Sequence, residues 1–305
     1  MTDIIERPGM GWFPDYPDYR DFNREQDIVA PKLKVLGQKD SIKAMLTKVG
    51  VGSPRKAAQT SIDLRQWCSP IENQGKLGSC TAHAGVGMVE YFEKKAFGKY
   101  IDASRLFLYK ITRNLLHWEG DRGAFLRTTM QALVLFGIPP EEYWPYHVTD
   151  IDKEPSAFAY AFAQSYQAIT YYRLDPFVTP KDLVLDHIKT YLENGLPSMF
   201  GFTVYESISQ ADTTGMIPFP SAGEKVIGGH AVVAVGYDNN IKIKGNTPAA
   251  VETTGAVLIR NSWGTQWGDG GYGWLPYDYV LNGLAIDWWS LLKNEWVDTG
   301  QFGLK

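Results

Sequence analysis

The stretch NQGKLGSCTAHAGVGMVEYF, residues 73–92, places a cysteine between a glycine-rich loop and an apolar pattern of helical period. After Cys80 the apolar side chains recur at steps of three and four, which predicts a helix with one buried face that ends at Gly98. Unpaired N–H groups and the dipole at a helix N-terminus lower the pKa of a thiol and favour the nucleophilic thiolate. Alone, this position decides little, because a cysteine at a helix start is more often a small buried hydrophobic residue.

The composition is that of an ordinary globular protein. Of the 305 residues, 44% are apolar and 21% are charged, with a formal net charge of -4. This balance gives no reason to expect nucleic acid or an anionic membrane as a partner. The chain has no apolar run of the roughly 18 residues that a membrane span needs, and its N-terminus lacks a secretory signal pattern. We therefore expect a protein that is cytoplasmic or of unknown location.

Cysteine and histidine usage argues against both a disulfide framework and a metal site. The chain has two cysteines, Cys68 and Cys80, and five scattered histidines without ligand spacing. Two cysteines are too few for a disulfide framework, which fits a reducing compartment. We expect no metal and no cofactor.

The sequence pattern changes along the chain from mainly helical to mainly β. Besides the helix at Cys80, helical patterns cover 40–50, 126–137 and 180–195. Short apolar or alternating runs with glycine at their ends predict strands near 197–205, 228–238, 255–264 and 270–277. A long polar connection is expected over residues 238–254. Helices in front and strands behind, without alternation, predict an α+β arrangement of two lobes.

Residues 1 to about 60 differ from the rest of the chain. The stretch GMGWFPDYPDYRDF, residues 9–22, is rich in aromatic residues, proline and aspartate, and it has no clear period. The basic, turn-rich stretch VGSPRKAAQTS, residues 51–61, links this part to the remainder. A detachable segment with a cleavable connection has these properties, and so does an N-terminal arm that packs on the domain.

A thiolate nucleophile needs a base that later returns a proton to the leaving group, and imidazole is suited to both steps. Of the histidines, His230 stands out in GGHAVVAVGYD, at the start of an apolar strand. It follows Gly228 and Gly229, which allow another chain to approach closely. A polar residue at such a place needs a partner.

The imidazole must also be held in one orientation by a third group. In IRNSWGTQWGDGGYGW, Asn261 lies at the end of another predicted strand. Its amide oxygen is suited to accept the imidazole N–H without adding charge, and Trp263 and Trp267 are placed to shield that bond from water. Taken singly, an asparagine at a strand end usually serves a turn.

Together these motifs resemble those of the papain-like cysteine peptidases. The likeness rests on DLRQWCSPIENQGKLGSC, GLPSMFGFTVYES, GGHAVVAVGYD and RNSWGTQWGDGGYG, and it covers roughly residues 61–280. The resemblance implies a papain-like two-lobe α+β fold with the active site in the cleft between the lobes. The catalytic domain would span 61–305, with a helical lobe at about 75–160 and an antiparallel β-barrel-like lobe at about 161–305.

The resemblance also implies catalytic roles. Cys80 would attack the scissile carbonyl, and His230 would form an ion pair with it and protonate the leaving amine. Asn261 would orient His230. Gln74 would share the oxyanion hole with the backbone N–H of Cys80, because a tetrahedral oxyanion requires preorganised donors.

Further residues would line the substrate groove. Gly120 and Gly123, in WEGDRGAFLR, resemble the strip against which an extended peptide forms backbone hydrogen bonds. Phe125 would line the pocket for the second residue before the cut, and Trp267 resembles the platform on the leaving side. Asp287 lies near the floor of that pocket in relatives, where a carboxylate would favour basic side chains. A salt-bridged, structural aspartate is the alternative.

The chain departs from the family pattern at two positions beside the cysteine. Relatives carry a disulfide-forming cysteine where this chain has Leu77, and usually an aromatic residue where it has Thr81. The family's first-lobe disulfide is therefore absent. Cys68 does not occupy the family's disulfide position and is expected to be a buried free thiol.

Relatives are made as precursors whose N-terminal segment runs through the groove. Residues 1 to about 60 occupy the matching place and lack the long helical signature of the plant and lysosomal type. We expect an inhibitory prosegment that is cut between about Gly37 and Thr60. The expected partners are a peptide or protein substrate and this segment, in a monomer. A transpeptidase or peptide ligase on the same site, or a catalytically silent peptide-binding protein, are the alternatives.

Overall fold

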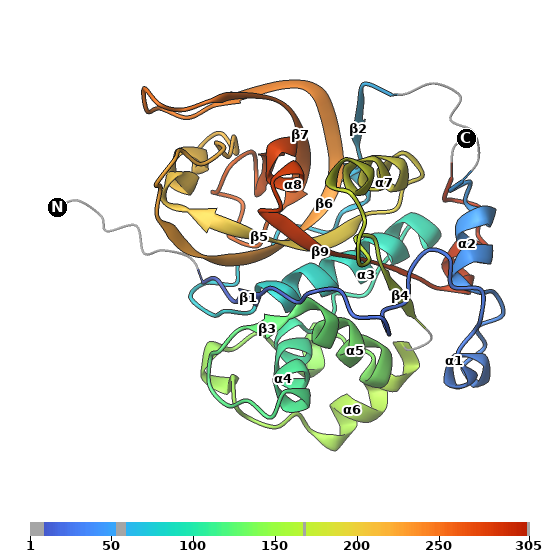
Figure 1. The fold of residues 1–305 in the computed structure, drawn as a ribbon. Helices are drawn as coiled ribbons and strands as arrows, with labels where there is room; N and C mark the ends of the chain where they lie inside the picture. Colours follow the sequence, from blue (N-terminus) through green and yellow to red (C-terminus); the bar gives the residue numbers. More distant parts are fainter. Residues whose placement is uncertain (1–8, 53–58, 167–168, 304–305) are drawn as a thin grey trace.

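The computed structural model describes residues 9–52, 59–166 and 169–303. Two groups of elements face each other, a helical group and a curved sheet, with helix α3 along their boundary (Figure 1). The helices are α1 (Pro31–Val35), α2 (Ile42–Lys48), α3 (Cys80–Phe97), α4 (Arg105–Leu115), α5 (Leu126–Phe136), α6 (Ala157–Ala163), α7 (Lys181–Glu193), α8 (Tyr277–Leu281) and α9 (Asn294–Val297). The strands are β1 (Trp12–Phe13), β2 (Ser61–Asp63), β3 (Ala124–Phe125), β4 (Thr170–Arg173), β5 (Ser198–Tyr205), β6 (Val226–Lys244), β7 (Glu252–Arg260), β8 (Tyr272–Pro276) and β9 (Ala285–Leu292).

The large sheet is antiparallel and has the order β4-β9-β5-β6-β7-β8, with β2 paired to β6. Helices α3 to α6 precede all strands of this sheet except β2, so the expected α+β arrangement of a helical part followed by a β part is confirmed. Within the described residues, no helix is both long and apolar enough to cross a bilayer.

Helix α3 begins at Cys80 and ends in a left-handed Gly98, as the sequence predicts. Its two internal glycines have packing reasons. A Cβ on Gly85 would lie 3.2 Å from a methyl carbon of Leu108 on α4, and one on Gly87 would lie 2.3 Å from the guanidinium of Arg260. Each glycine weakens the helix by about 1 kcal/mol relative to alanine. In return, α3 packs closely against α4 on one side and against the side chain of Arg260, the last residue of β7, on the other.

The expectation of a polar connection over 238–254 is wrong in its outer parts. Strand β6 continues to Lys244 and β7 already begins at Glu252, where these two residues pair across a long hairpin (Figure 1). Ile243 is buried and pairs with Thr253, which is also buried. The alternation in IKIK was therefore a strand signal that the neighbouring polar residues concealed.

Residues 9–22 form a strap between the helical group and the sheet (Figure 1). Strand β1 pairs in parallel with β3, with Trp12 opposite Ala124 and Phe13 opposite Phe125. Further along, the backbone N–H of Arg173 donates to the carbonyl of Phe22 at 2.7 Å. We call residues 9–22 the groove strand, because they lie beside the cysteine described below.

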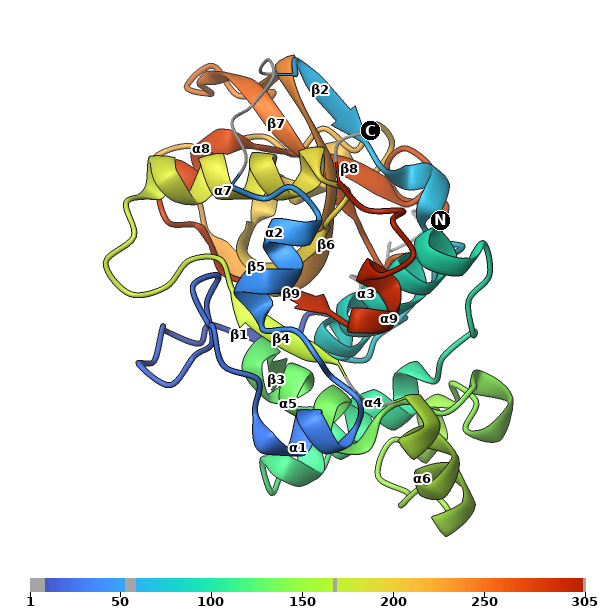
Figure 2. The same ribbon diagram turned by 90° about the vertical axis from the view of Figure 1, so that its right-hand side faces the viewer.

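Helix α2 belongs to the main hydrophobic core, although it comes from the N-terminal segment (Figure 2). Asp40 and Ser41 are both possible caps from the sequence, and Ser41 is the one that caps the helix, by accepting a hydrogen bond from the N–H of Ala44. The apolar side chains on its inner face and in the turn after it are at most 7% exposed; they are Ile42, Met45, Leu46, Val49 and Val51. Burial of such side chains contributes roughly 2 kcal/mol each, so this part of the segment is held by apolar packing.

Candidate active site

Cys80 lies fully buried at the first position of α3. Burial raises the pKa of its thiol to about 11, while the backbone N–H groups of Ala231, Gly11 and Thr81 act as donors toward the sulfur and oppose that rise. Ala231 directly follows His230, so β6 brings the histidine beside the cysteine. Gly11 belongs to the groove strand, which therefore directs an N–H toward the sulfur.

His230 is fully buried and oriented by Asn261. Its Nε2 donates to Oδ1 of Asn261 at 2.7 Å, and the N–H of Ser262 donates to the same oxygen at 2.8 Å. The other ring nitrogen, Nδ1, has no hydrogen-bond partner among the described residues. Trp263 stacks on the imidazole with a centroid distance of 4.5 Å, and Trp267 packs edge-on against Trp263. Burial lowers the pKa of His230 to about 4, so the covered site favours a neutral thiol beside a neutral imidazole.

Gln74 is buried, and its side-chain amide is fixed at both ends. Its Oε1 accepts from the hydroxyl of Ser262 at 2.6 Å, which leaves Nε2 as the donor. Nε2 donates to the carbonyl of Leu77 at 2.7 Å and to the carbonyl of Gly9 at 3.0 Å. Gly9 belongs to the groove strand, so this strand accepts one of the two hydrogen bonds that Nε2 of Gln74 donates.

The groove strand lies very close to the loop that precedes the cysteine. A Cβ on Gly9 would lie 2.2 Å from the carbonyl oxygen of Leu77, and one on Gly11 would lie 1.9 Å from that of Gly78. A Cβ on Gly123 would likewise lie 2.2 Å from the carbonyl of Gly11, and Ala124 donates to that carbonyl at 2.7 Å. Only glycines permit this approach of three backbone segments.

Trp12 fills a pocket next to His230. Its ring lies where a Cβ on Gly201 would stand, 1.9 Å from Cε2, and its carbonyl lies against Gly229. The indole Nε1 donates to Oδ2 of Asp287 at 3.1 Å, at the buried end of the pocket. The pocket therefore has glycine walls and a carboxylate floor.

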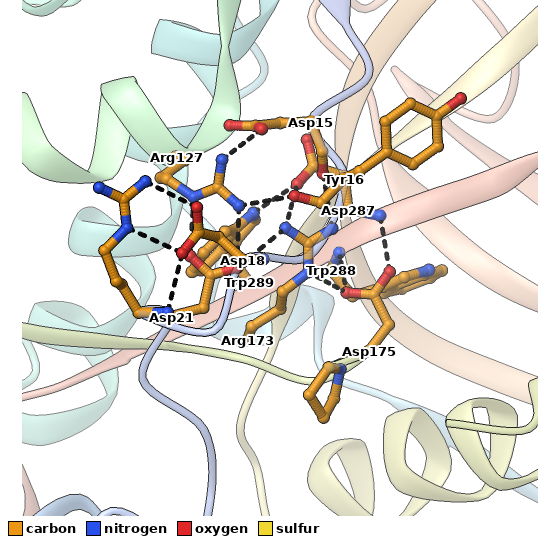
Figure 3. A network of polar contacts seen from close by, with 12 residues as sticks. Asp15, Tyr16, Asp18, Asp21, Arg127, Arg173, Asp175, Asp287, Trp288 and Trp289 are labelled. Carbon is orange, nitrogen blue, oxygen red and sulfur yellow. Dashed lines mark hydrogen bonds and ion pairs between the residues drawn. The ribbon is translucent and has the colours of Figure 1, made fainter. Parts of the chain in front are cut away.

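Asp287 is also part of an ion pair, which was the alternative expected from the sequence. Its Oδ1 lies 3.2 Å from Nη1 of the fully buried Arg173 and accepts from Nε1 of Trp289 at 2.7 Å (Figure 3). Burial raises the pKa of Asp287 to about 7, while Arg173 and Trp12 act in the opposite direction. A pocket floor with its own guanidinium partner offers little attraction to a second cation.

The remaining predicted groove residues, Phe125, Trp267 and Gly120, have different surroundings. Phe125 packs against Phe13 and Trp118, with ring centroids 5.8 and 5.7 Å away. Trp267 lines a cavity of 670 Å³ together with Met10 of the groove strand. Gly120 stands apart, because a Cβ there would meet nothing within 4 Å; its positive φ of 72° serves a turn.

Three site residues were missed by the sequence analysis: Trp12, Ser262 and Arg173. The sequence signal for Trp12 was its place in the glycine-rich start of the groove strand. A large side chain between small residues is suited to fill a pocket. Nothing local marks Arg173, whose partners lie 2 to 158 residues away in the chain. Both cysteines are buried and free, as expected for Cys68.

Comparison with known proteins gives consistent matches. The family model described as papain family cysteine protease matches residues 58–284. A peptidase C1-like protein of Acanthamoeba polyphaga mimivirus is 36% identical over 239 residues, which cover 75% of this chain and 71% of that protein. Chymopapain of Carica papaya is 25% identical over 67% of this chain, which spans half (50%) of the length of chymopapain. Xylellain, a cysteine protease from Xylella fastidiosa, superimposes with a TM-score of 0.70 and 30% identity, covering 95% of this chain and 99% of that structure.

Proposed function

Since this chain belongs to the papain family of cysteine proteases, we propose that it is an endopeptidase that cleaves peptide bonds through a thioester on Cys80. The observation that carries this assignment is the buried His230. Its Nε2 is bonded to Asn261, while its Nδ1 is unpartnered among the described residues, next to the residue whose N–H acts on the Cys80 sulfur. Nδ1 is thus available to exchange a proton with the Cys80 sulfur, while the hydrogen bond to Asn261 keeps a proton on Nε2.

The reaction proceeds in two halves. His230 Nδ1 takes the thiol proton as the Cys80 sulfur bonds to the scissile carbonyl carbon, and it then gives that proton to the leaving amine as the C–N bond breaks. The same imidazole then takes a proton from water as the water oxygen bonds to the thioester carbonyl carbon. The C–S bond breaks, the acid product leaves, and the proton returns to the Cys80 sulfur. Departure of the groove strand admits water to the cleft, which lowers the cost of charge on both groups and makes the thiolate–imidazolium pair accessible.

The donor of Gln74 would stabilise the oxyanion of the tetrahedral intermediate. Replacing Gln74 with alanine is expected to lower kcat by about 10²- to 10³-fold, because loss of one oxyanion donor costs about 3 to 4 kcal/mol. KM is expected to change little, since the interaction strengthens only in the transition state. Steady-state kinetics of activated enzyme on a fluorogenic peptide measures both, and an unchanged kcat would contradict the role of Gln74.

Covalent labelling tests the nucleophile directly. A peptidyl chloromethyl ketone with phenylalanine as the second residue before the reactive group is expected to alkylate Cys80 and to leave Cys68 unmodified. Labelling should be lost in His230→Ala, because the imidazole supplies the thiolate. Peptide mapping by mass spectrometry gives the site and the rate. Labelling that persists in His230→Ala, or that occurs at Cys68, would contradict the proposed mechanism.

The same experiment addresses the pocket of Trp12 and Asp287. We propose that it receives the second residue before the cut and prefers a large aromatic side chain, because Trp12 already fits it. The ion pair of Asp287 with Arg173 supports a structural role for this carboxylate over selection of basic residues. A probe with arginine in place of phenylalanine should label more slowly, and faster labelling by the arginine probe would restore the preference for basic side chains.

We also propose that residues 1 to about 60 act as an inhibitory prosegment of a zymogen. The groove strand presents an N–H to the Cys80 sulfur, whereas a substrate must present a carbonyl carbon. This geometry explains how the strand could occupy the site without being cut there. Cleavage between about Gly37 and Thr60 remains the proposal, and residues 53–58 of that range lie outside the described residues.

Two alternatives use the same scaffold. A transpeptidase or ligase would form the same thioester and pass the acyl group to an amine in place of water. A catalytically silent peptide-binding protein would not require the fixed tautomer of His230 or the aligned donor of Gln74. Both features favour an enzyme, and analysis of products formed with and without an added amine separates hydrolysis from ligation.

A further inference from the structure

Two arginines from different elements converge on Asp15 and Asp21 of the groove strand (Figure 3). Arg127 comes from α5, and Arg173 is the last residue of β4. The side chain of Arg127 is 18% exposed and that of Arg173 is 0% exposed. A buried guanidinium must have acidic or polar partners. Those partners that belong to the groove strand are the ones that each arginine loses when the strand departs.

Arg127 draws its partners from the groove strand. Nε and Nη2 donate to the two carboxylate oxygens of Asp21 at 2.7 and 2.8 Å, a bidentate arrangement. Nη1 pairs with the carboxylate of Asp15, and Nη2 also donates to the carbonyl of Tyr16 at 2.8 Å. Within the described parts of the chain, both carboxylates that contact Arg127 belong to the groove strand.

Arg173 divides its partners between the groove strand and the sheet. Nη2 donates to the carbonyl of Asp15 at 2.7 Å, and Nη1 lies 3.5 Å from Asp21. On the other side, Nε donates to Asp175 at 2.9 Å, and Nη1 pairs with Asp287. When the strand departs, Arg173 keeps two carboxylates, whereas Arg127 loses both of its own.

We propose that the uncovered enzyme uses Arg127, supported by Arg173, as a subsite for an acidic side chain of the substrate. The carboxylates of Asp15 and Asp21 stand in for that side chain in the covered enzyme. A half-buried guanidinium with unmade hydrogen bonds favours a carboxylate partner, because paired N–H groups bind the two oxygens in a fixed geometry. In the covered enzyme a hollow of 220 Å³ lies beside Arg127, between the groove strand and a wall that includes Gln131 and Tyr171. That wall remains when the strand departs, and the acidic group of a substrate would lie against it.

The position of the acidic residue follows from the spacing in the groove strand. Asp15 comes three residues after Trp12, which is roughly 10 Å in an extended chain. The proposal rests on the assignment of the Trp12 pocket to the second residue before the cut. Met10 lies beside Trp267 on the leaving side, so the groove strand passes that side before the Trp12 pocket and runs opposite to a substrate. On that assignment and direction, the carboxylate belongs to the fourth or fifth residue before the cut.

Equilibrium binding to the full chain tests the subsite without requiring turnover. The reference protein carries Cys80→Ala to prevent cleavage, and Trp12→Ala, Asp15→Asn and Asp21→Asn to remove the anchors of the groove strand. Two peptides are compared by calorimetry at low salt, each with phenylalanine second before the cut, and with either aspartate or asparagine at both the fourth and fifth positions. The aspartate peptide is expected to bind about tenfold more tightly, the usual effect of a charge-assisted hydrogen bond.

Substitutions in the reference protein locate the effect. Arg127→Gln should make the two peptides bind equally. Arg127→Lys should retain part of the preference, because lysine keeps the positive charge but lacks the paired N–H groups of the guanidinium. Arg122→Gln removes an exposed arginine of the neighbouring loop and should keep the full preference. Equal binding of the two peptides to the reference protein, an unaltered preference in Arg127→Gln, or no binding of either peptide would each overturn the subsite. Failure of Cys80 labelling would instead overturn the proposed function and leave this comparison intact.

Discussion

A chain that begins at Pro31 is expected to hydrolyse a peptide substrate about 10³-fold faster than the uncut full-length protein. Residues in the groove strand are tethered to the enzyme, and a short tether gives an effective concentration near the millimolar range. A strand with micromolar intrinsic affinity then leaves only about one molecule in 1,000 open at any time. Initial rates, measured before any self-processing, give the ratio of the two activities.

The truncation at Pro31 is chosen so that α1 and α2 remain. A full-length Trp12→Ala variant provides the matched comparison, since it removes the side chain that fills the pocket and leaves the ion pairs with Arg127. Its activity should lie between those of the two other proteins. Full activity of the intact, uncut protein would show that the strand does not restrain the enzyme.

Replacing Met45 with aspartate is expected to destabilise the catalytic part of the protein by about 4 kcal/mol or more, because it buries a charge in an apolar core. Met45 is fully buried on α2, and the neighbouring Asn294 binds the start of this region through the backbone N–H groups of Lys39 and Asp40. Chemical denaturation of the Cys80→Ala background measures the loss without interference from self-cleavage.

The exposed face of the same helix supplies the control. Thr47→Asp introduces the same side chain into α2 at an exposed position and is expected to change stability by less than about 0.5 kcal/mol. Similar losses in both variants would mean that α2 tolerates no acidic residue anywhere. No loss in Met45→Asp would mean that α2 contributes little to the stability of the folded chain. The expected result would show that α2 is part of the core that stabilises the uncut protein.

Much of the fold could be predicted because its elements carry local signals. Helix α3 has its apolar period and the terminal Gly98, and α2 has the cap of Ser41. Helix α4 was missed, although Ser104 caps it by accepting from Phe107. Its buried residues include arginine and lysine side chains, but its apolar side chains still recur with a helical period, so the sequence did carry a signal for this helix.

The site was only partly accessible from the sequence, for a physical reason. Cys80 begins α3, Asn261 directly follows β7, and His230 lies within β6 after two glycines, so each stands in a short motif that is visible locally. The contacts between Arg173 and the groove strand depend on how distant elements approach, and no periodicity encodes them. The role of Trp12 is likewise set by the glycines of other strands, which open the space that its ring fills.

The position of Asp287 bears on how substrate preference could change among related enzymes. Its carboxylate accepts the indole N–H of Trp12 and forms the floor of the pocket that Trp12 fills. If the groove strand is the inhibitory segment proposed above, a substitution of Asp287 that suits a different substrate would also alter how tightly that segment binds. Substrate preference and inhibition of the uncut enzyme would then evolve together, and a change in one would call for a compensating change at Trp12.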